Sequence, residues 1–243
     1  MKRIFVLIAI CFYNLAQAQQ FISNGLVEYE VRVDNYKSLG DDTWWQMFRD
    51  KIPNFSVQWY DLTFSNNKAV YKFNRLDERT KMPSFLNNSS QDNIWFSDYS
   101  SGTFTDQKDI FGNTYLLEDT LMNMKWKMVP NETREIAGFN CRKAQTVIFD
   151  SVYVFAFYTD EITVSGGPMG IHGLPGMILG ITIPRMYTSW IADKVEVNGV
   201  NTTAIVAPDD GKKKKATELL ETVKKATSDW GSYAQQIIWQ LFL

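Results

Sequence analysis

The chain has few of the side chains that bind metals or form disulfide bonds. Its 243 residues include one histidine, His172, and two cysteines, Cys11 and Cys141. Structural zinc sites usually take four ligands from cysteine and histidine, so these three residues cannot supply one. Cys11 lies in the N-terminal segment discussed next, which leaves Cys141 as the single thiol of the mature chain. We therefore expect no internal disulfide, and a fold that depends on its hydrophobic core.

The sequence also lacks an apolar run of the roughly 20 residues that a membrane-spanning helix needs. Residues 4–13 are apolar, follow the basic pair Lys2 and Arg3, and precede the A-x-A site that ends at Ala18. This order predicts a signal peptide over residues 1–18, with cleavage after Ala18. We expect an exported protein of the periplasm or of the outer-membrane periphery, with at most peripheral contact to a membrane.

A strong excess of charge of either sign is missing as well. The formal net charge is −2, which gives no reason to expect a nucleic-acid partner. Aromatic residues make up 14% of the chain, and such residues fit the pleated surface of a sheet. The composition favours a mainly β protein.

Short strands separated by turn residues recur along the chain. Residues 25–34 alternate apolar and polar side chains, with Val27, Tyr29, Val31 and Val33 on one face. Further strands are predicted over 56–73 as a pair, and over 93–99, 103–110, 114–118, 124–129, 139–149, 151–158, 178–183, 188–197 and 202–206.

This succession predicts a curved antiparallel sheet or partial barrel with meander topology. A short N-terminal helical segment is predicted over residues 41–52, and a C-terminal helix over 216–226. Residues 19–243 should form a single domain, with 208–243 as a helical extension. We expect the apolar end, residues 237–243, to dock on the sheet, with helix continuation or membrane contact as alternatives. The basic run Lys212–Lys215 reads as a solvated helix start, or as a contact for an anionic surface.

Residues 167–180 concentrate five glycines and two prolines around His172. Glycine serves where the backbone needs a positive φ or close approach, and proline fixes φ. The segment ends in the apolar run 177–179. It should form a shaped loop that feeds a buried strand, either as a structural corner or as a binding site.

Catalytic constellations are missing from the sequence. Ser165 is not in a nucleophile elbow, and His172 has no predictable acid partner. Cys141 lies in an apolar strand, which is typical of an inert buried thiol. Asp160 and Glu161 follow a strand, a position typical of a solvated turn rather than of a catalytic pair of acids. We expect no cofactor and a binding protein rather than an enzyme.

Methionine side chains are candidate ligands for a metal ion. Met122, Met124 and Met128 lie close together in sequence, and Met169 and Met177 flank His172. Thioethers and imidazole suit Cu(I), so a soft-metal protein that uses Met169, His172 and Met177 is the alternative function. Methionines more commonly fill gaps in cores, and on a strand Met122, Met124 and Met128 would share one face.

The segment Gly173-Leu174-Pro175-Gly176-Met177-Ile178-Leu179 closely resembles the hallmark of the bacterial GLPGLI family, with Met177 in place of the usual leucine. Trp126 and residues 131–144 are similar to the segment W…E-T-K-x-I-x-G-Y-x-C-x-K-A of that family. The resemblance implies an exported cell-envelope protein without an assigned activity. It also implies an envelope partner, because the genes of such proteins often lie near those of outer-membrane receptors.

Together these observations predict a non-enzymatic protein that binds an apolar ligand or an outer-membrane protein partner. The structural motif should be formed by Gly173, Leu174, Pro175, Gly176, Met177 and Ile178. Residues near it that could contact a ligand or partner are Trp126, Cys141, Pro168 and His172. The motif would close one end of the curved sheet, or line the mouth of an apolar cavity.

Overall fold

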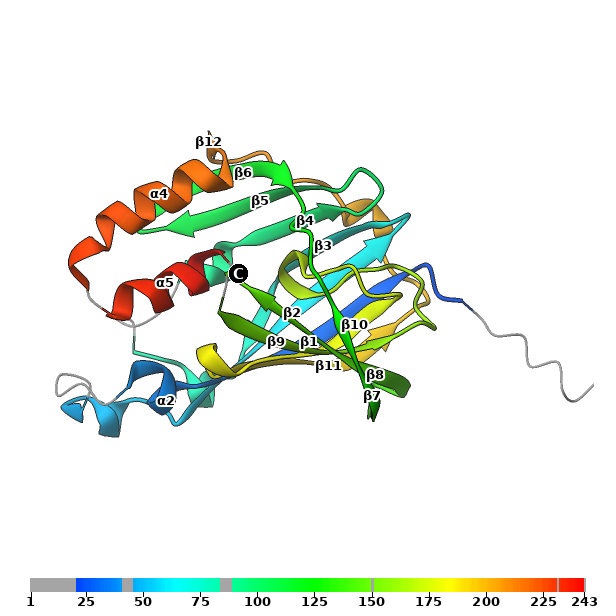
Figure 1. Ribbon diagram of the computed structural model, residues 1–243, viewed down its shortest axis with the longest axis horizontal. Helices are drawn as coiled ribbons and strands as arrows, with labels where there is room; N and C mark the ends of the chain where they lie inside the picture. Colours follow the sequence, from blue (N-terminus) through cyan, green and yellow to red (C-terminus); the bar gives the residue numbers. More distant parts are fainter. Residues whose placement is uncertain (1–20, 41–45, 84–88, 150, 231, 243) are drawn as a thin grey trace, which may run out of the picture.

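The computed structural model describes residues 21–40, 46–83, 89–149, 151–230 and 232–242. In this part of the chain, twelve strands form one curved sheet in the order β12-β6-β5-β4-β3-β2-β1-β11-β10-β9-β8-β7, and the two end strands do not pair with each other (Figure 1). All neighbours are antiparallel except β12 and β6. The predicted curved antiparallel sheet is therefore confirmed. The predicted signal peptide lies outside the described residues.

The strands are β1 (Asn24–Asp34), β2 (Phe55–Ser65), β3 (Lys68–Leu76), β4 (Ile94–Asp98), β5 (Thr103–Ile110), β6 (Asn113–Thr120), β7 (Lys127–Ile136), β8 (Phe139–Ile148), β9 (Val152–Thr159), β10 (Met177–Ile183), β11 (Thr188–Glu196) and β12 (Lys212–Lys214). The α-helices are α2 (Asn35–Leu39), α4 (Ala216–Ala226) and α5 (Ser232–Phe242). Short 3-10 turns are η1 (Arg49–Lys51), η2 (Glu78–Thr80), η4 (Ser89–Asp92), η5 (Pro168–Gly170), η6 (Pro184–Met186), η7 (Thr202–Ala204) and η8 (Ser228–Trp230).

The sheet consists of two meanders joined at β1. Strands β1 to β6 follow one another on one side, and β7 to β11 follow one another on the other. Val27, Tyr29 and Val31 of β1 are buried, as their alternation predicts. β1 pairs with β2 along its whole length and with β11 on its other edge. The first strand of the domain thus lies in the middle of the sheet.

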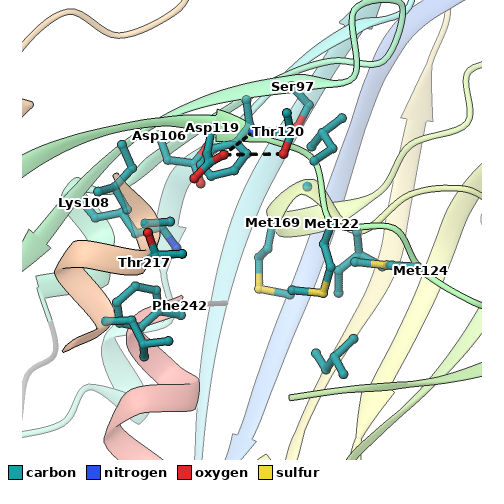
Figure 2. A pocket seen from close by; sticks show the side chains of 18 of the residues that line it. Ser97, Asp106, Lys108, Asp119, Thr120, Met122, Met124, Met169, Thr217 and Phe242 are labelled. Carbon is teal, nitrogen blue, oxygen red and sulfur yellow. Dashed lines mark hydrogen bonds between the residues drawn. The ribbon is translucent and has the colours of Figure 1, made fainter. Parts of the chain in front are cut away.

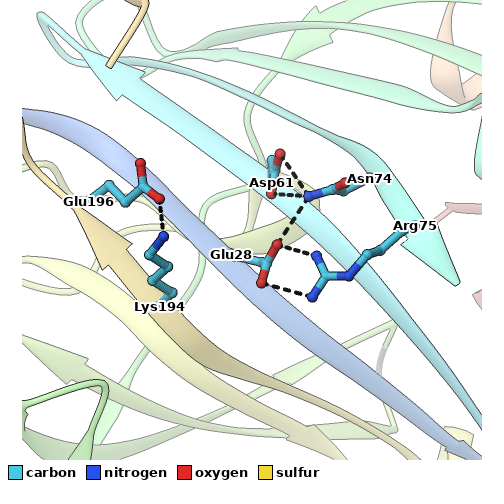
Figure 3. A network of polar contacts seen from close by, with 6 residues as sticks. All are labelled: Glu28, Asp61, Asn74, Arg75, Lys194 and Glu196. Carbon is cyan, nitrogen blue, oxygen red and sulfur yellow. Dashed lines mark hydrogen bonds and ion pairs between the residues drawn. The ribbon is translucent and has the colours of Figure 1, made fainter. Parts of the chain in front are cut away.

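The outward face of this central region is polar. Glu28 lies between Tyr29 and Val27 on β1, so its side chain points to the opposite face. It forms an ion pair with Arg75 and accepts a hydrogen bond of 3.1 Å from Asn74, which also donates to Asp61 (Figure 3). A solvated outer face and an apolar inner face are typical of an antiparallel sheet that packs on one side only.

Two hydrophobic clusters fill the inner face. The larger contains the inward residues of β1, β2 and β8 to β11, together with the end of the 167–180 segment. The smaller joins Ile110 and Leu117 of the sheet to Leu219 and Val223 of α4 and to Leu241 of α5. Ile238, Trp239 and Leu241 are buried, so the apolar C-terminal segment docks on the protein as expected. Figure 1 shows α4 and α5 beside the β4–β6 end of the sheet.

Several local predictions differ from the structure. Residues 41–45 of the predicted helix 41–52 lie outside the described residues; of the remainder, Gln46 is helical and residues 49–51 form the turn η1, so the described part is not one continuous helix. Residues 202–204 form η7, and 205–206 have no regular structure, so the predicted strand is wrong. Residues 121–126 have no regular structure, so β7 begins later than predicted, at Lys127.

The basic run is another difference. Lys212–Lys214 is not a solvated helix start, because it forms the short strand β12. Its backbone pairs in parallel with residues 115–117 of β6 and extends the sheet by one strand. Lys213 also forms an ion pair of 3.0 Å with Glu118.

Candidate functional site

The segment 167–180 forms a rigid corner before β10. Gly173 and Gly176 have φ values of +93° and +134°, in the region that favours glycine. A Cβ atom at position 176 would lie 2.0 Å from the backbone oxygen of Thr159, so no larger residue fits there. Leu174, Met177 and Ile178 are buried behind the turn, whereas Pro175 is exposed.

Long-range hydrogen bonds hold this corner in place. The Ser165 hydroxyl donates to the carbonyl oxygen of Leu174 over 2.6 Å and accepts from the amide of Gly173 over 3.2 Å. The Tyr29 hydroxyl donates to the carbonyl oxygen of Ile178 over 2.5 Å. Burial raises the pKa of Tyr29 well above its ordinary value, so this hydroxyl remains a donor. The corner is thereby tied to the central strand of the sheet.

Trp126 and His172 both make contacts that stabilise this corner. The Trp126 indole donates to the carbonyl oxygen of His172 over 2.8 Å. The His172 ring stacks on Tyr99 at a centroid distance of 5.8 Å, and its Nδ1 lies 3.0 Å from the carbonyl oxygen of Gly170. Pro168 is buried.

Cys141 is fully buried in the larger core cluster. Burial raises the pKa of its thiol to about 12, so the thiol stays protonated and is unreactive at neutral pH. None of the four predicted contact residues, Trp126, Cys141, Pro168 and His172, lines the cavity described next.

A cavity of about 370 Å³ lies between the helices, the β4–β6 strands and the 167–180 segment (Figure 2). Its apolar wall comes from Leu117 on β6, Leu220 on α4, Phe242 on α5, Ile148 at the end of β8, and Ile171. Met169 and Gly170, just ahead of the hallmark motif, also line it. The segment that forms the corner before β10 therefore also contributes Met169, Gly170 and Ile171 to the cavity wall.

Polar side chains gather on the strand side of the cavity. Figure 2 shows Ser97, Asp106, Asp119 and Thr120 along β4 to β6, opposite the methionines. Asp106 and Lys108 are 8% and 3% exposed, so β5 places two ionisable groups almost out of water. The Lys108 ammonium donates to the carbonyl oxygen of Leu241 over 3.2 Å, which ties the end of α5 to the sheet.

Burial controls the protonation of this pair. It raises the pKa of Asp106 to about 7, although the positive charge of Lys108 opposes the shift. Burial also lowers the pKa of Lys108 to about 8, against the attraction of Asp106. Both groups therefore change charge close to neutral pH, at the wall of the cavity.

The pattern of β5 could have identified this pair. Phe104 and Ile110 are apolar and lie an even number of residues apart, so they share one face with Asp106 and Lys108. A charged pair on the inner face of a strand is uncommon and marks a candidate site.

The predicted metal set is not brought together. Met169 lines the cavity, but Met177 is fully buried in the larger core cluster, and His172 packs against Tyr99. Met122 and Met128 are 44% and 46% exposed, so neither is the core residue that the alternative interpretation required. In the described residues, no three side chains of histidine, cysteine, aspartate and glutamate are grouped to hold a metal ion.

Comparison with family models finds a match over residues 145–180, to a family described as a protein of unknown function (Porph_ging). This stretch includes β9, the corner and the start of β10. No curated protein matches the chain. None of the described helices is both long and apolar enough to span a membrane.

Two solved structures of PNGF-II, in the P21 and C2 space groups, are similar in fold. Their TM-scores are 0.52 and 0.50, at 14% and 15% sequence identity. Each similarity covers 84% of this chain but only 34% and 33% of the respective PNGF-II chain. This chain thus spans about a third of those proteins, and at such low identity the likeness concerns the fold alone.

Proposed function

We propose that this protein binds a small amphipathic molecule in the cavity between the helices and the sheet. The observation that carries this proposal is a partly open cavity of about 370 Å³ with an apolar wall and a buried ionisable pair on one side. Pockets for small ligands usually measure about 300–1,000 Å³ and combine mostly apolar walls with a few polar groups.

The placement of the side chains suggests how such a ligand would lie. Its apolar body would contact Leu117, Ile171 and Leu220, and its polar end would face Asp106 and Ser97. Asp106 has its pKa raised to about 7, so near neutral pH it is available both as a hydrogen-bond donor and as an acceptor. A ligand with one polar end is therefore preferred to a pure hydrocarbon, which would displace water from these polar groups without replacing its hydrogen bonds.

A cavity-filling substitution tests this proposal. Leu220→Trp places a larger ring in the cavity, because Leu220 lines it from α4. We expect the variant to bind the apolar fluorophore N-phenyl-1-naphthylamine about tenfold or more weakly than the wild type. Fluorescence titration, with long-chain fatty acids as competitors, measures this effect.

Val206→Trp is the matched control, since Val206 is 66% exposed and lies outside the cavity. It should bind the fluorophore as the wild type does. Equal affinity of the wild type and the Leu220→Trp variant would refute binding in this cavity.

We also propose that the chain is an exported GLPGLI-type protein of the cell envelope, in the periplasm or at the outer-membrane periphery. The hallmark at 173–179 and the signal-peptide pattern of residues 1–18 support this assignment. A match to a family of unknown function over residues 145–180, which include the hallmark, is consistent with it.

An outer-membrane protein is the second candidate partner. The observation that favours it is an exposed apolar strip on the outward face of the β8–β9 hairpin. Val147 and Tyr153 are cross-strand partners there and are 45% and 54% exposed, and Tyr153 stacks on Phe155. Charge reversal beside this strip, Lys143→Glu, should weaken co-purification with an envelope protein if the strip is the contact surface. Unchanged co-purification would exclude this surface.

A further inference from the structure

Three methionines from two separate segments meet at the cavity. Met122 and Met124 belong to residues 121–126, which connect β6 to β7, and Met169 belongs to η5. All three line the cavity, and Figure 2 shows their side chains grouped on the side opposite Asp106 and Asp119. The chain has nine methionines in total, so a third of them face this one space.

The exposure of these side chains distinguishes them from methionines that fill a core. Met177 and Met186 are 0% and 5% exposed and are packed in the larger cluster, as gap-filling methionines usually are. Met122 is 44% exposed, and Met124 and Met169 are half-buried. Solvent can therefore reach the group at Met122, while the other two side chains are held by the core.

The backbone at Met169 is held in a conformation that side chains with a Cβ seldom adopt. Its φ and ψ are +55° and +30°, and Gly170 follows with a φ of +72°. Non-glycine residues in this region are uncommon and cluster at functional sites. The buried Pro168 and the hydrogen bond from the Ile171 amide to the Pro168 carbonyl, 3.0 Å long, fix this turn. The turn directs the Met169 side chain into the cavity.

We propose that Met122, Met124 and Met169 form a binding site for a soft monovalent cation, Cu(I) or Ag(I). Neutral thioethers are soft ligands that select Cu(I) over hard cations such as Mg²⁺ and Ca²⁺. Together the three side chains would supply three thioether sulfur atoms and no charged ligand. Apolar side chains around the group, including Phe149 and Ile171, limit the access of water to its inner side, while Met122 leaves the site reachable for an ion from solvent.

This site differs from the methionine and histidine set that the sequence suggested. Only Met169 is common to both. His172 is directed to Gly170 and Tyr99, and Met177 is sealed in the core, so neither reaches the cavity. Metal binding can be tested separately from binding of the amphipathic ligand. Replacing each methionine with leucine keeps the cavity wall apolar while it removes the sulfur atom that would bind the metal ion.

Methionine methyl resonances give a direct test. Ag(I), a redox-inert substitute for Cu(I), is titrated into protein labelled with [methyl-¹³C]methionine. We expect the signals of Met122, Met124 and Met169 to shift and to saturate at one ion per site. Met122→Leu, Met124→Leu and Met169→Leu assign the three signals, and leucine is close in volume, so the variants should fold normally.

The matched controls are Met128→Leu and Met47→Leu. Met128 and Met47 are 46% and 69% exposed and lie outside the cavity. Their signals should not move at the first equivalent of silver, and their variants should bind silver as the wild type does. Cys141, the single thiol of the mature chain, is present in every variant, so thiol binding cancels from each comparison.

Two results would overturn the proposal. One is the absence of any shift at Met122, Met124 and Met169 when thiols are saturated. The other is an equal response of exposed Met47 and Met128, which would indicate unspecific thioether binding. Fluorophore binding by the triple leucine variant is measured in parallel. If this variant still binds the fluorophore but no longer responds to silver, metal binding and ligand binding depend on different side chains of the cavity.

Discussion

At the scale of single residues, Asp106 is the group whose environment differs most from that of an ordinary surface carboxylate. Burial raises its pKa from 3.8 to about 7. Between these values the folded protein keeps a proton that the unfolded chain has released. The contribution of Asp106 to stability is therefore present at acidic pH and is lost as the pH rises from about 4 to about 7.

The variant Asp106→Asn tests this linkage. The free energy of unfolding of the wild type, relative to that of the variant, should fall by on the order of 2 kcal/mol between about pH 5 and about pH 7. Urea unfolding followed by circular dichroism at several pH values measures the difference.

Ser97→Ala changes another buried residue of the same cavity without removing a titratable group. It should leave the pH dependence as in the wild type. A difference between the wild type and Asp106→Asn that stays constant with pH would show that Asp106 ionises normally. In the wild type, burial lowers the pKa of Lys108 to about 8, so its contribution makes stability rise from about pH 8 to about pH 10.5, above the range of this test.

Single residues were predictable where local chemistry decides their role. Gly173 and Gly176 could be assigned positive φ values from the density of glycine and proline around them, and both have them. Met122 and Met169 were not predictable as neighbours, because a long stretch of chain separates them and only the folded connection between β6 and β7 brings them to one cavity.

At the scale of elements, the corner before β10 depends on one close backbone approach. Gly176→Ala forces a Cβ to within 2.0 Å of the Thr159 carbonyl oxygen and keeps a φ of +134°. We expect a loss of about 3 kcal/mol or more in the free energy of unfolding, since both the strain and the displacement of β9 contribute. Urea unfolding at neutral pH measures it.

Gly102→Ala is the control for this substitution. Gly102 has a similar left-handed backbone, with a φ of +70°, but no atom lies within 4 Å of the added Cβ. The free energy of unfolding of Gly102→Ala should fall by only about 1 kcal/mol, because the left-handed backbone is unfavourable for alanine. An equal fall in the free energy of unfolding of the two variants would contradict the claim that the corner has no room for a side chain at position 176.

Elements that form by local pairing were predicted well. The hairpin of β8 and β9 and the strands β4, β5 and β6 lie close to their predicted positions, because short turns connect neighbouring strands. β12 was missed, since a three-residue strand made of lysines has no apolar alternation and is defined only by its parallel pairing to β6. The predicted strand 202–206 was wrong, because Asn201 caps the turn η7 there instead.

At the scale of the whole molecule, curvature of the sheet creates the site. The sequence predicted a meander but not the pairing of β1 with β11, which joins residues more than 150 positions apart. That pairing places β7 and β6 at or near opposite ends of the sheet, so their connection must pass from one end to the other. The connection, the corner and the two C-terminal helices then enclose a space that no single element defines.

The central claim is that this space holds a ligand. Native mass spectrometry of the protein purified from the cells that naturally produce it tests this claim most directly, with the wild type and Leu220→Trp compared in parallel. We predict one amphipathic molecule per wild-type chain and its loss from the variant. A wild-type protein that carries no such molecule, or a variant that carries it equally, would contradict the account.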